Sequence, residues 1–265
     1  MCNLAGLDLS FFPAFYQSVL SAWHSLGGRG NTQAQSYTMY LSDRPVSEMT
    51  VKANYAFLLD KSFQPPHCVE KWRPVYGDLY WSDTWSQFLL AKFHRSTADL
   101  SWKVAHGVLY TLDRLARFQY SNLKDCYCES AGESLEHLFF SCPLAQSVLG
   151  WVSLLFFTAA PNSPTLQPRH LLFGFNGQEL ASVPKIFPVI LILCKWSIWL
   201  ARNDYRFRDR RPSVEDVIAS LKAHVIFSIR RHFRHCTSDS STFVKQWCAN
   251  GLLGTIEGER LRLKI

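Results

Sequence analysis

Residues 126–142 read CYCESAGESLEHLFFSC and place three cysteines and one histidine within a short stretch. Zn²⁺ in proteins takes about four sulfur or nitrogen ligands in a tetrahedral arrangement. Two thiolates on a turn, followed by a histidine and a third thiolate, can supply such a set. The sequence therefore predicts a zinc site whose ligands are Cys126, Cys128, His137 and Cys142.

The two halves of this stretch differ in how closely they follow a common zinc pattern. The segment from Leu135 to Cys142 is predicted to be helical, so that His137 and Cys142 return to neighbouring faces near the helix end. Cys126 and Cys128 form a Cys-x-Cys pair, whereas Cys-x₂-Cys is the commoner spacing. A ligand from elsewhere could therefore replace either thiolate, and the candidates are His94, His106 and the His67–Cys68 pair.

The cysteines and histidines also allow two other interpretations. Free cysteine is among the most buried residue types, so the thiols could simply pack in a reducing compartment. Their clustering argues against this, because three of the eight cysteines lie in one stretch and the others are scattered. A second possible metal group is weaker, since no tight second pair completes it and histidines on a basic helix commonly face solvent. Its members are His232, His235, Cys236 and Cys248.

The sequence around the cysteines resembles a known family. Residues 102–111 (WKVAHGVLYT), the Cys126 and Cys128 pair, residues 136–145 (EHLFFSCPLA) and Trp151 are similar to the reverse-transcriptase zinc-binding domain. The pattern of that domain begins with a helix that carries W-R-x-x-H-G, and a Cys-x₂-Cys pair follows. A segment with Glu-x-x-His-Leu-Phe-x-x-Cys-Pro comes next, and a tryptophan closes the pattern. It occupies the C-terminal part of the polyprotein of LINE-type non-LTR retrotransposons. Lys103 stands where the family often has Arg, and the first cysteine pair is one residue shorter.

Flanking segments extend the resemblance over roughly residues 10 to 205. Phe12–Trp23 is similar to a segment upstream of the domain, and His170–Phe175 and Lys195–Asn203 are similar to downstream helices. The resemblance implies a zinc-stapled module that helps to hold template RNA or target DNA near the polymerase. It implies as partners the transcript of the element, its target site and the upstream polymerase region of the same polyprotein.

The C-terminal third carries nearly all of the excess positive charge. Between Lys195 and Arg234 there are ten Lys or Arg against four acidic residues, a net of +6 within a total of +7. Such a stretch can neutralise phosphates and release counterions, and Tyr205 and Phe207 within it can stack on bases. The alternative is a solvated helix face. Beside a module associated with nucleic acids, we predict phosphate contacts from Arg202, Arg206, Arg208, Arg210, Arg211, Arg230 and Arg234.

Apolar periodicity indicates a mainly α fold, an irregular helical array with a small zinc-stapled knuckle between helices. Helices are predicted over 11–23, 47–59, 72–93, 98–118 and 144–157, and from Ser213 onward. The predicted organisation has four parts. These are an N-terminal amphipathic helix and linker (1–40), a helical region with the zinc-binding module (41–158, knuckle about 123–151), C-terminal helices with the basic stretch (159–236) and a loosely ordered tail (237–265).

The sequence favours a binding protein over an enzyme. It contains no Asp-Asp pair on a hairpin-like strand, no Gly-x-Ser-x-Gly elbow and no glycine-rich phosphate loop. The longest apolar run, 186–194, contains Pro188 and is followed by Lys195, so no membrane span is expected. We therefore predict a non-catalytic, zinc- and nucleic-acid-binding part of a LINE-type reverse transcriptase, located in the nucleus or cytoplasm. The alternative function is a helical protein-interaction or scaffold module, a domesticated or decayed remnant without metal.

Overall fold

The computed structural model divides the chain into two compact units, Met1–Gln64 and Pro65–Ile265. It describes residues 40–41, 44–45, 50, 66–88, 90, 95–120, 125–129, 132–161 and 165–265. In the first unit, strands β1 (Tyr40–Leu41) and β2 (Arg44–Pro45) pair in antiparallel fashion. The helices predicted over 11–23 and 47–59 lie outside the described residues.

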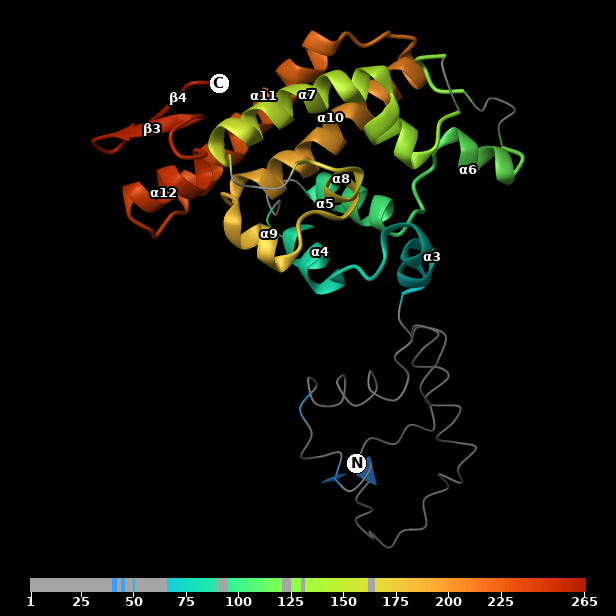
Figure 1. Ribbon diagram of the computed structural model, residues 1–265, viewed down its shortest axis with the longest axis horizontal. Coiled ribbons are helices and arrows are strands. Elements are labelled where there is room, and N and C mark those ends of the chain that lie inside the picture. Colours follow the sequence, from blue (N-terminus) through green and yellow to red (C-terminus); the bar gives the residue numbers. More distant parts are fainter. Residues whose placement is uncertain are drawn as a thin grey trace, which may run out of the picture. The chain divides into compact units, whose positions relative to one another are not determined.

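The second unit is mainly α-helical, which confirms the predicted fold class (Figure 1). Its first part contains α3 (His67–Tyr76), α4 (Trp81–Phe88), α5 (Arg95–Ala105), α6 (Leu112–Arg117), the π-helix η4 (His137–Ser141) and α7 (Pro143–Ala159). The second part contains α8 (Pro168–Phe173), α9 (Gly177–Ser182), α10 (Ile186–Arg208), α11 (Val214–Arg234), α12 (Ser240–Trp247) and the strands β3 (Gly254–Glu257) and β4 (Arg260–Leu263). The Cys and His cluster of residues 126–142 lies between helices.

Helix α10 forms the centre of the core. It contacts α7 and α11, and also α4, α5 and α8, and Figure 1 shows it running between these two groups. Its sequence is apolar around most of its circumference from Ile186 to Cys194, which is the pattern of a helix that is covered on all sides. Pro188 lies in the first turn, where a backbone N–H has no intrahelical partner, and the helix therefore tolerates it.

The burial of α10 accounts for its apolar character. By length and composition alone the helix could cross a membrane, but 78% of its most apolar window is buried inside the protein. Lys195 does not end the apolar segment as the sequence suggests. It is only 1% exposed, its ammonium lies 5.2 Å from the centre of the Phe88 ring, and burial lowers its pKa to about 7.

Local sequence signals place two of the long helices correctly. The helix predicted over 144–157 is α7, which begins with Pro143 at its first position. Helix α11 begins where Ser213 was expected to cap it, because the Ser213 hydroxyl accepts a hydrogen bond from the Asp216 backbone N–H at 3.0 Å. The apolar stripe of this helix is buried at Val217, Leu221, Val225 and Ile229.

The helix predicted over 98–118 is interrupted. Helix α5 ends at Ala105, and Gly107 adopts a φ of +62°, which favours glycine and stops the helix. The Lys71 ammonium donates to the Gly107 carbonyl at 3.0 Å, so a side chain from distant α3 occupies the space beside this glycine. The next helix, α6, then begins at Leu112. The apolar repeat was misleading because it continues across Gly107, the glycine at which the helix ends.

Replacement of Gly107 by alanine is expected to lower the free energy of unfolding by about 1–2 kcal/mol, because a left-handed residue with a Cβ is strained. The added Cβ would also lie 2.0 Å from Lys71 Nζ, which would have to move. Gly150→Ala is the matched control, since that helical glycine faces open space and alanine there should stabilise the helix by about 0.5–1 kcal/mol. Urea denaturation followed by circular dichroism checks both. Equal stability of Gly107→Ala and wild type would contradict the expectation.

The predicted division into parts also changes. Residues 237–265 were expected to be a loosely ordered tail, but they contain α12 and an antiparallel hairpin in which Gly254 pairs with Leu263. Phe243, Cys248 and Leu253 from this segment are buried in the core, which is why it is ordered. Residues 65–265 form one unit, so neither 158 nor 236 is a boundary between compact units.

Candidate metal centre

A short loop carries the first two cysteines of the centre. Its ends are joined by a bridge between Asp125 and Gly132, and within it the Glu129 N–H donates to the Cys126 carbonyl at 2.9 Å. Glu129 itself has a φ of +61°. In an extended chain the side chains of residues i and i+2 share one face but lie far apart. The tight turn shortens this spacing, and the Cys-x-Cys pair can therefore face one point.

The second half of the centre depends on the π-helix η4. The Cys142 N–H donates to the His137 carbonyl at 2.7 Å, a hydrogen bond between residues five apart. This wider turn places residues i and i+5 on one face, which an α-helix of 3.6 residues per turn does not do. The predicted helical character of 135–142 is confirmed, and its π geometry explains how His137 and Cys142 meet.

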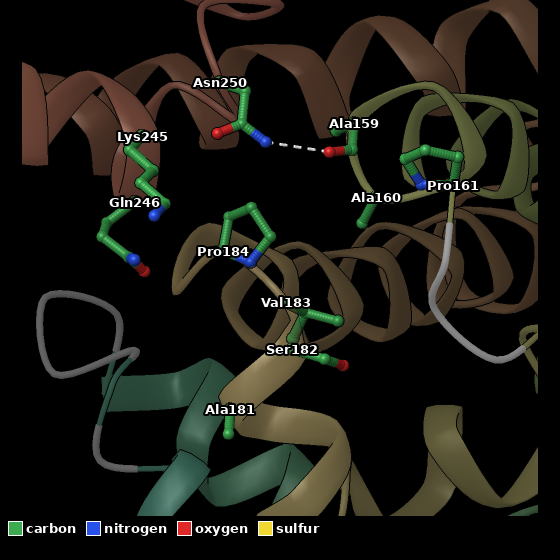
Figure 2. A pocket seen from close by; sticks show the side chains of 10 residues that line it. All are labelled: Ala159, Ala160, Pro161, Ala181, Ser182, Val183, Pro184, Lys245, Gln246 and Asn250. Carbon is green, nitrogen blue, oxygen red and sulfur yellow. Dashed lines mark hydrogen bonds between the residues drawn. The ribbon is translucent and has the colours of Figure 1, made fainter.

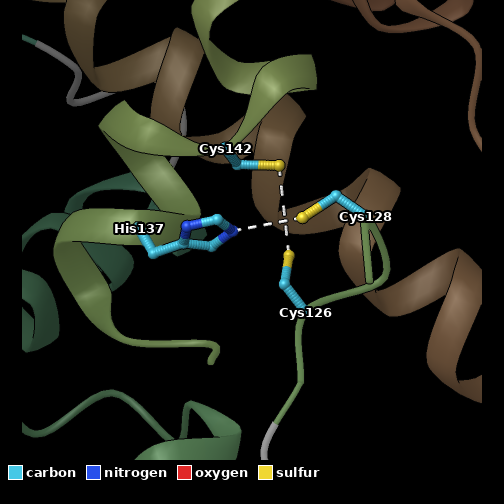
Figure 3. A group of neighbouring side chains, drawn as sticks. All are labelled: Cys126, Cys128, His137 and Cys142. Atoms are coloured by element: carbon cyan, nitrogen blue, oxygen red, sulfur yellow. Dashed lines mark hydrogen bonds between the residues drawn. The ribbon is translucent and has the colours of Figure 1, made fainter. Parts of the chain in front are cut away.

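The four predicted ligands converge in space. The ligand atoms of Cys126, Cys128, His137 and Cys142 all lie within 4.8 Å of one another (Figure 3). Cys126 Sγ is 4.0 Å from Cys142 Sγ, and Cys128 Sγ is 3.3 Å from His137 Nε2. Two thiolates on a tetrahedral zinc ion, each bound at about 2.3 Å, would be about 3.8 Å apart. The residues present therefore fit a single four-coordinate metal ion.

The Cys126 thiol and the start of α7 favour a thiolate at Cys142, whereas burial opposes it. Cys126 and Cys142 are 2% and 0% exposed, so the centre is closed to solvent on that side. Cys142 is the N-cap of α7, so its sulfur lies at the positive end of the helix dipole, near the backbone N–H groups of Leu144 and Ala145. The hydrogen bond from the Cys126 thiol is the largest cause that lowers the pKa of Cys142, to about 5 despite its burial, and the Tyr127 hydroxyl and the N–H groups of α7 lower it further.

The same pairing raises the pKa of Cys126, first through its hydrogen bond to Cys142 and then through burial. Tyr127, between the two loop cysteines, contacts Cys142 Sγ through its hydroxyl at 3.6 Å. Burial is the main cause that raises the pKa of Tyr127, so its hydroxyl remains a hydrogen-bond donor. A cation bound here would remove the competition between the thiols by stabilising all of them as thiolates.

A buried ion pair fixes the loop to the core. Glu133 is 0% exposed, and its carboxylate accepts hydrogen bonds from Arg202 Nη2 at 2.7 Å and from the Leu112 N–H at 2.9 Å. Arg202 reaches it from α10, with its guanidinium 4.8 Å from the Trp199 ring centre. Glu133 was not found from the sequence, because an acidic residue in a polar loop carries no local signal of burial.

The role predicted for Arg202 was wrong. Its side chain is committed to Glu133 and only 3% exposed, so it cannot contact a phosphate in solution. The other predicted arginines of α10 and of the segment after it lie nearer the surface. Arg206 donates to the Asp125 carbonyl, Arg211 lies 3.9 Å from Glu129, and the Tyr205 ring lies 5.8 Å from that of Tyr127. The end of α10 thus lies directly against the cysteine loop.

The remaining predicted arginines are placed differently. Arg208 and Arg210 are exposed, and Arg208 pairs with Asp204 at 2.6 Å. Arg230 and Arg234 are exposed near the end of α11. At a rise of 1.5 Å per residue, Arg230 is about 24 Å along this helix from its start beside α10. The arginines of the predicted basic stretch therefore lie on two separate surfaces, one at the end of α10 and one near the end of α11.

The alternative ligands are used in other ways. His106 stacks between Trp102 and Trp85, at ring distances of 4.0 and 5.2 Å, and Cys68 is buried in α3. His94 lies outside the described residues. The His232 ring stacks on Trp247 at 3.5 Å. Within the described part of the chain, the cluster at 126–142 is the group of Cys, His, Asp or Glu side chains positioned to hold one ion.

A cavity of about 300 Å³ lies elsewhere, where α12 approaches the start of α10 (Figure 2). Its walls include Pro184, Lys245 and Asn250, and the Asn250 amide donates to the Ala159 carbonyl at 2.9 Å. The residues that line it include no histidine, cysteine or carboxylate. It does not share residues with the metal centre.

Comparisons with known proteins agree with this centre. Residues 50–149 match the model of the family described as zinc-binding in reverse transcriptase. A segment of 72 residues is 40% identical to the "Transposon TX1 uncharacterized 149 kDa protein" of Xenopus laevis. The match covers 27% of this chain and 5% of that much longer protein. No solved structure matches the chain.

Proposed function

We propose that this chain, which carries a reverse-transcriptase zinc-binding domain over residues 50–149, is the non-catalytic, nucleic-acid-binding C-terminal part of a LINE-type reverse transcriptase. In this role it holds template RNA or target DNA close to the polymerase region of the same polyprotein. The observation that carries the proposal is the contact between the metal centre and the arginine-rich end of α10. An intracellular location is part of the proposal, because thiols stay reduced there.

Zinc is the proposed metal. Three sulfur ligands and one imidazole in a closed, tetrahedral arrangement are typical of structural zinc sites, whereas catalytic sites keep a position open for water. The ion would supply a rigid link between the cysteine loop and the start of α7. Cys126, Cys128, His137 and Cys142 would hold it, and the Glu133–Arg202 pair would keep the loop in place.

The proposed phosphate-binding surface is the exposed end of α10 and the segment that follows. Arg208, Arg210 and Arg211 are exposed there, and Phe207 is 78% exposed beside them. An apolar ring that is left in water within a cluster of cations is suited to stacking on an unpaired base. Arg230 and Arg234 form a second basic surface at the end of α11, which we propose extends the contact along the strand.

Neutralising Arg208, Arg210 and Arg211 as a triple Arg→Gln variant is expected to weaken nucleic-acid binding and to lower the slope of log Kobs against log salt. Each lost phosphate contact removes about 0.7 to 0.9 from that slope, so the triple variant should lose about 2. Fluorescence anisotropy between 50 and 300 mM salt, roughly the range where such slopes are measured, checks this.

The control is a triple Lys→Gln variant of exposed Lys185, Lys245 and Lys264, which has the same change in net charge. Lys185 precedes α10 and is separated from Arg208 by about 35 Å of helix. An equal loss of affinity and slope in both variants would mean that net charge alone acts, which is the result that rejects a specific surface at α10.

A further inference from the structure

Two cations outside α10 converge on one backbone carbonyl. Lys71 Nζ and Arg114 Nη1 donate to the Gly107 oxygen at 3.0 and 2.9 Å. This carbonyl lies just beyond the end of α5, where a helix presents about half a negative charge. Two full positive charges exceed what one such end can balance. Within the described residues, neither cation forms an ion pair with a carboxylate.

A third cation lies near enough to repel Lys71, although it is itself paired with an acid. Arg117 follows Arg114 on α6 after almost one turn, and it pairs with Asp113 at 2.8 Å where both side chains are well exposed. Burial lowers the pKa of Lys71, and repulsion from Arg114 and Arg117 lowers it further. The three charges therefore act on one another across a short distance. A phosphate placed among them would relieve the repulsion and form charge-assisted hydrogen bonds.

An exposed aromatic side chain lies in the last turn of α5, the helix whose end these cations contact. Trp102 is 45% exposed although its ring packs on His106 at 4.0 Å, and His106 is followed directly by Gly107. His106 in turn stacks on Trp85, and Trp85 stacks on Trp81 at 5.3 Å. The stack fixes the orientation of Trp102. The Arg114 guanidinium lies 5.5 Å from the centre of a second exposed ring, that of Phe118, which is 53% exposed.

Capping of α5 explains part of this arrangement but not all of it. One donor is enough to satisfy the Gly107 carbonyl, and a buried Trp102 would stabilise the fold more than one left in water. Single-stranded nucleic acid exposes the faces of its bases, which can stack on a rigid aromatic ring, and its phosphates can bind nearby cations. In a duplex the base faces are buried between neighbouring base pairs, so they cannot stack on a protein side chain.

We propose that the surface formed by Lys71, Trp102, Arg114 and Arg117 binds single-stranded nucleic acid, with a backbone phosphate between the cations and a base stacked on Trp102. The inference rests on the proposed function and adds a second contact, specific for unpaired strands, to the phosphate contacts of α10. Helix α6 is joined to the metal centre through the Leu112 N–H and Glu133, so both surfaces belong to one folded unit.

The test measures binding of the full, zinc-loaded chain to fluorescein-labelled oligo(U) RNA, oligo(dT) DNA and a duplex of equal length by fluorescence anisotropy. Trp102→Leu should weaken binding to both single strands by about 5- to 150-fold, since stacking of one base contributes about 1–3 kcal/mol. Its salt slope and its duplex affinity should stay as in wild type. Trp102→Phe keeps an aromatic face and should recover most of the affinity. Arg114→Gln should instead lower the single-strand salt slope by about 0.7.

The matched control is Phe157→Leu on α7, which removes another exposed aromatic ring and should leave binding unchanged. Zinc content and circular dichroism establish that each variant is folded.

The inference is overturned if Trp102→Leu binds single strands as wild type does, or if it loses duplex and single-strand affinity equally. Wild type that binds none of the probes rejects the proposed function as well. Wild type that binds single strands through the α10 arginines, with no effect of Trp102→Leu, rejects the second surface alone. The ratio of the affinities for oligo(U) RNA and oligo(dT) DNA then shows which kind of single strand the surface prefers.

Discussion

Cys142→Ser is expected to abolish stoichiometric zinc binding and to lower the free energy of unfolding by on the order of 5 kcal/mol. Zinc bound to a site of this kind contributes about 10–16 kcal/mol of binding free energy at neutral pH, and because the unfolded chain has no such site, much of this becomes folding free energy. Cys142 is the ligand with the largest structural role, since it is also the N-cap residue of α7 and is fully buried. Its loss would therefore separate the cysteine loop from α7.

Elemental analysis of the purified chain and thermal denaturation with and without a chelator measure this effect. We expect about one zinc per wild-type chain, less than a tenth of that in Cys142→Ser, and a chelator-sensitive Tm in wild type only. Cys248→Ser is the control, because Cys248 is also 0% exposed but lies outside the centre. Cys248→Ser should keep its zinc, and its free energy of unfolding should fall only by the cost of placing a serine hydroxyl in a buried position. Full zinc content in Cys142→Ser would show that this residue is not a ligand.

Glu133→Gln is expected to have the second largest effect, a loss of about 3–5 kcal/mol in the free energy of unfolding. The substitution removes the charge opposite the buried Arg202 guanidinium, and an uncompensated buried charge costs several kcal/mol. The amide of glutamine can still accept from the Leu112 N–H, so the effect isolates the charge. Urea denaturation of wild type and variant measures it.

Two further variants make this expectation specific. Asp99→Asn removes the exposed partner of Lys103 and should cost less than about 1 kcal/mol, because an ion pair in water is weak. Combining Glu133→Gln with Arg202→Met removes both charges and should restore part of the stability that Glu133→Gln alone has lost. If Glu133→Gln and Asp99→Asn lower the free energy of unfolding by equally small amounts, the buried pair does not fix the cysteine loop to α10.

Much of the metal centre could be predicted because its signal is local. The four ligands fall within one short stretch, and the helix starts at Ser213 and Pro143 are marked by residue type, a capping serine and a proline in the first helical position. The doubtful Cys-x-Cys spacing was resolved only by the turn at Glu129 and the π-helix that follows His137. Neither could be read from the sequence, because a backbone hydrogen bond between residues five apart leaves no residue pattern.

The basic stretch shows the limit of reasoning from charge. Arg202 belongs to the same run as Arg206 and Arg208, and counting charges gives all of them the same role. The structure separates them, since Arg202 meets a carboxylate 69 residues away while Arg208 remains in water. Similarly, the folded hairpin after α12 depends on an apolar core built by the preceding helices.

The sequence by itself determined the helical class, the residues able to bind a metal and the start of the best-capped helices. The reason is that spacing, capping and apolar periodicity act between residues that are neighbours along the chain. The tertiary structure alone decided which cations are buried, which side chain contacts the end of α5 and how the arginines lie against the cysteine loop. Those outcomes depend on pairs such as Lys71 with Gly107 and Glu133 with Arg202, and such pairs meet only when the chain has folded.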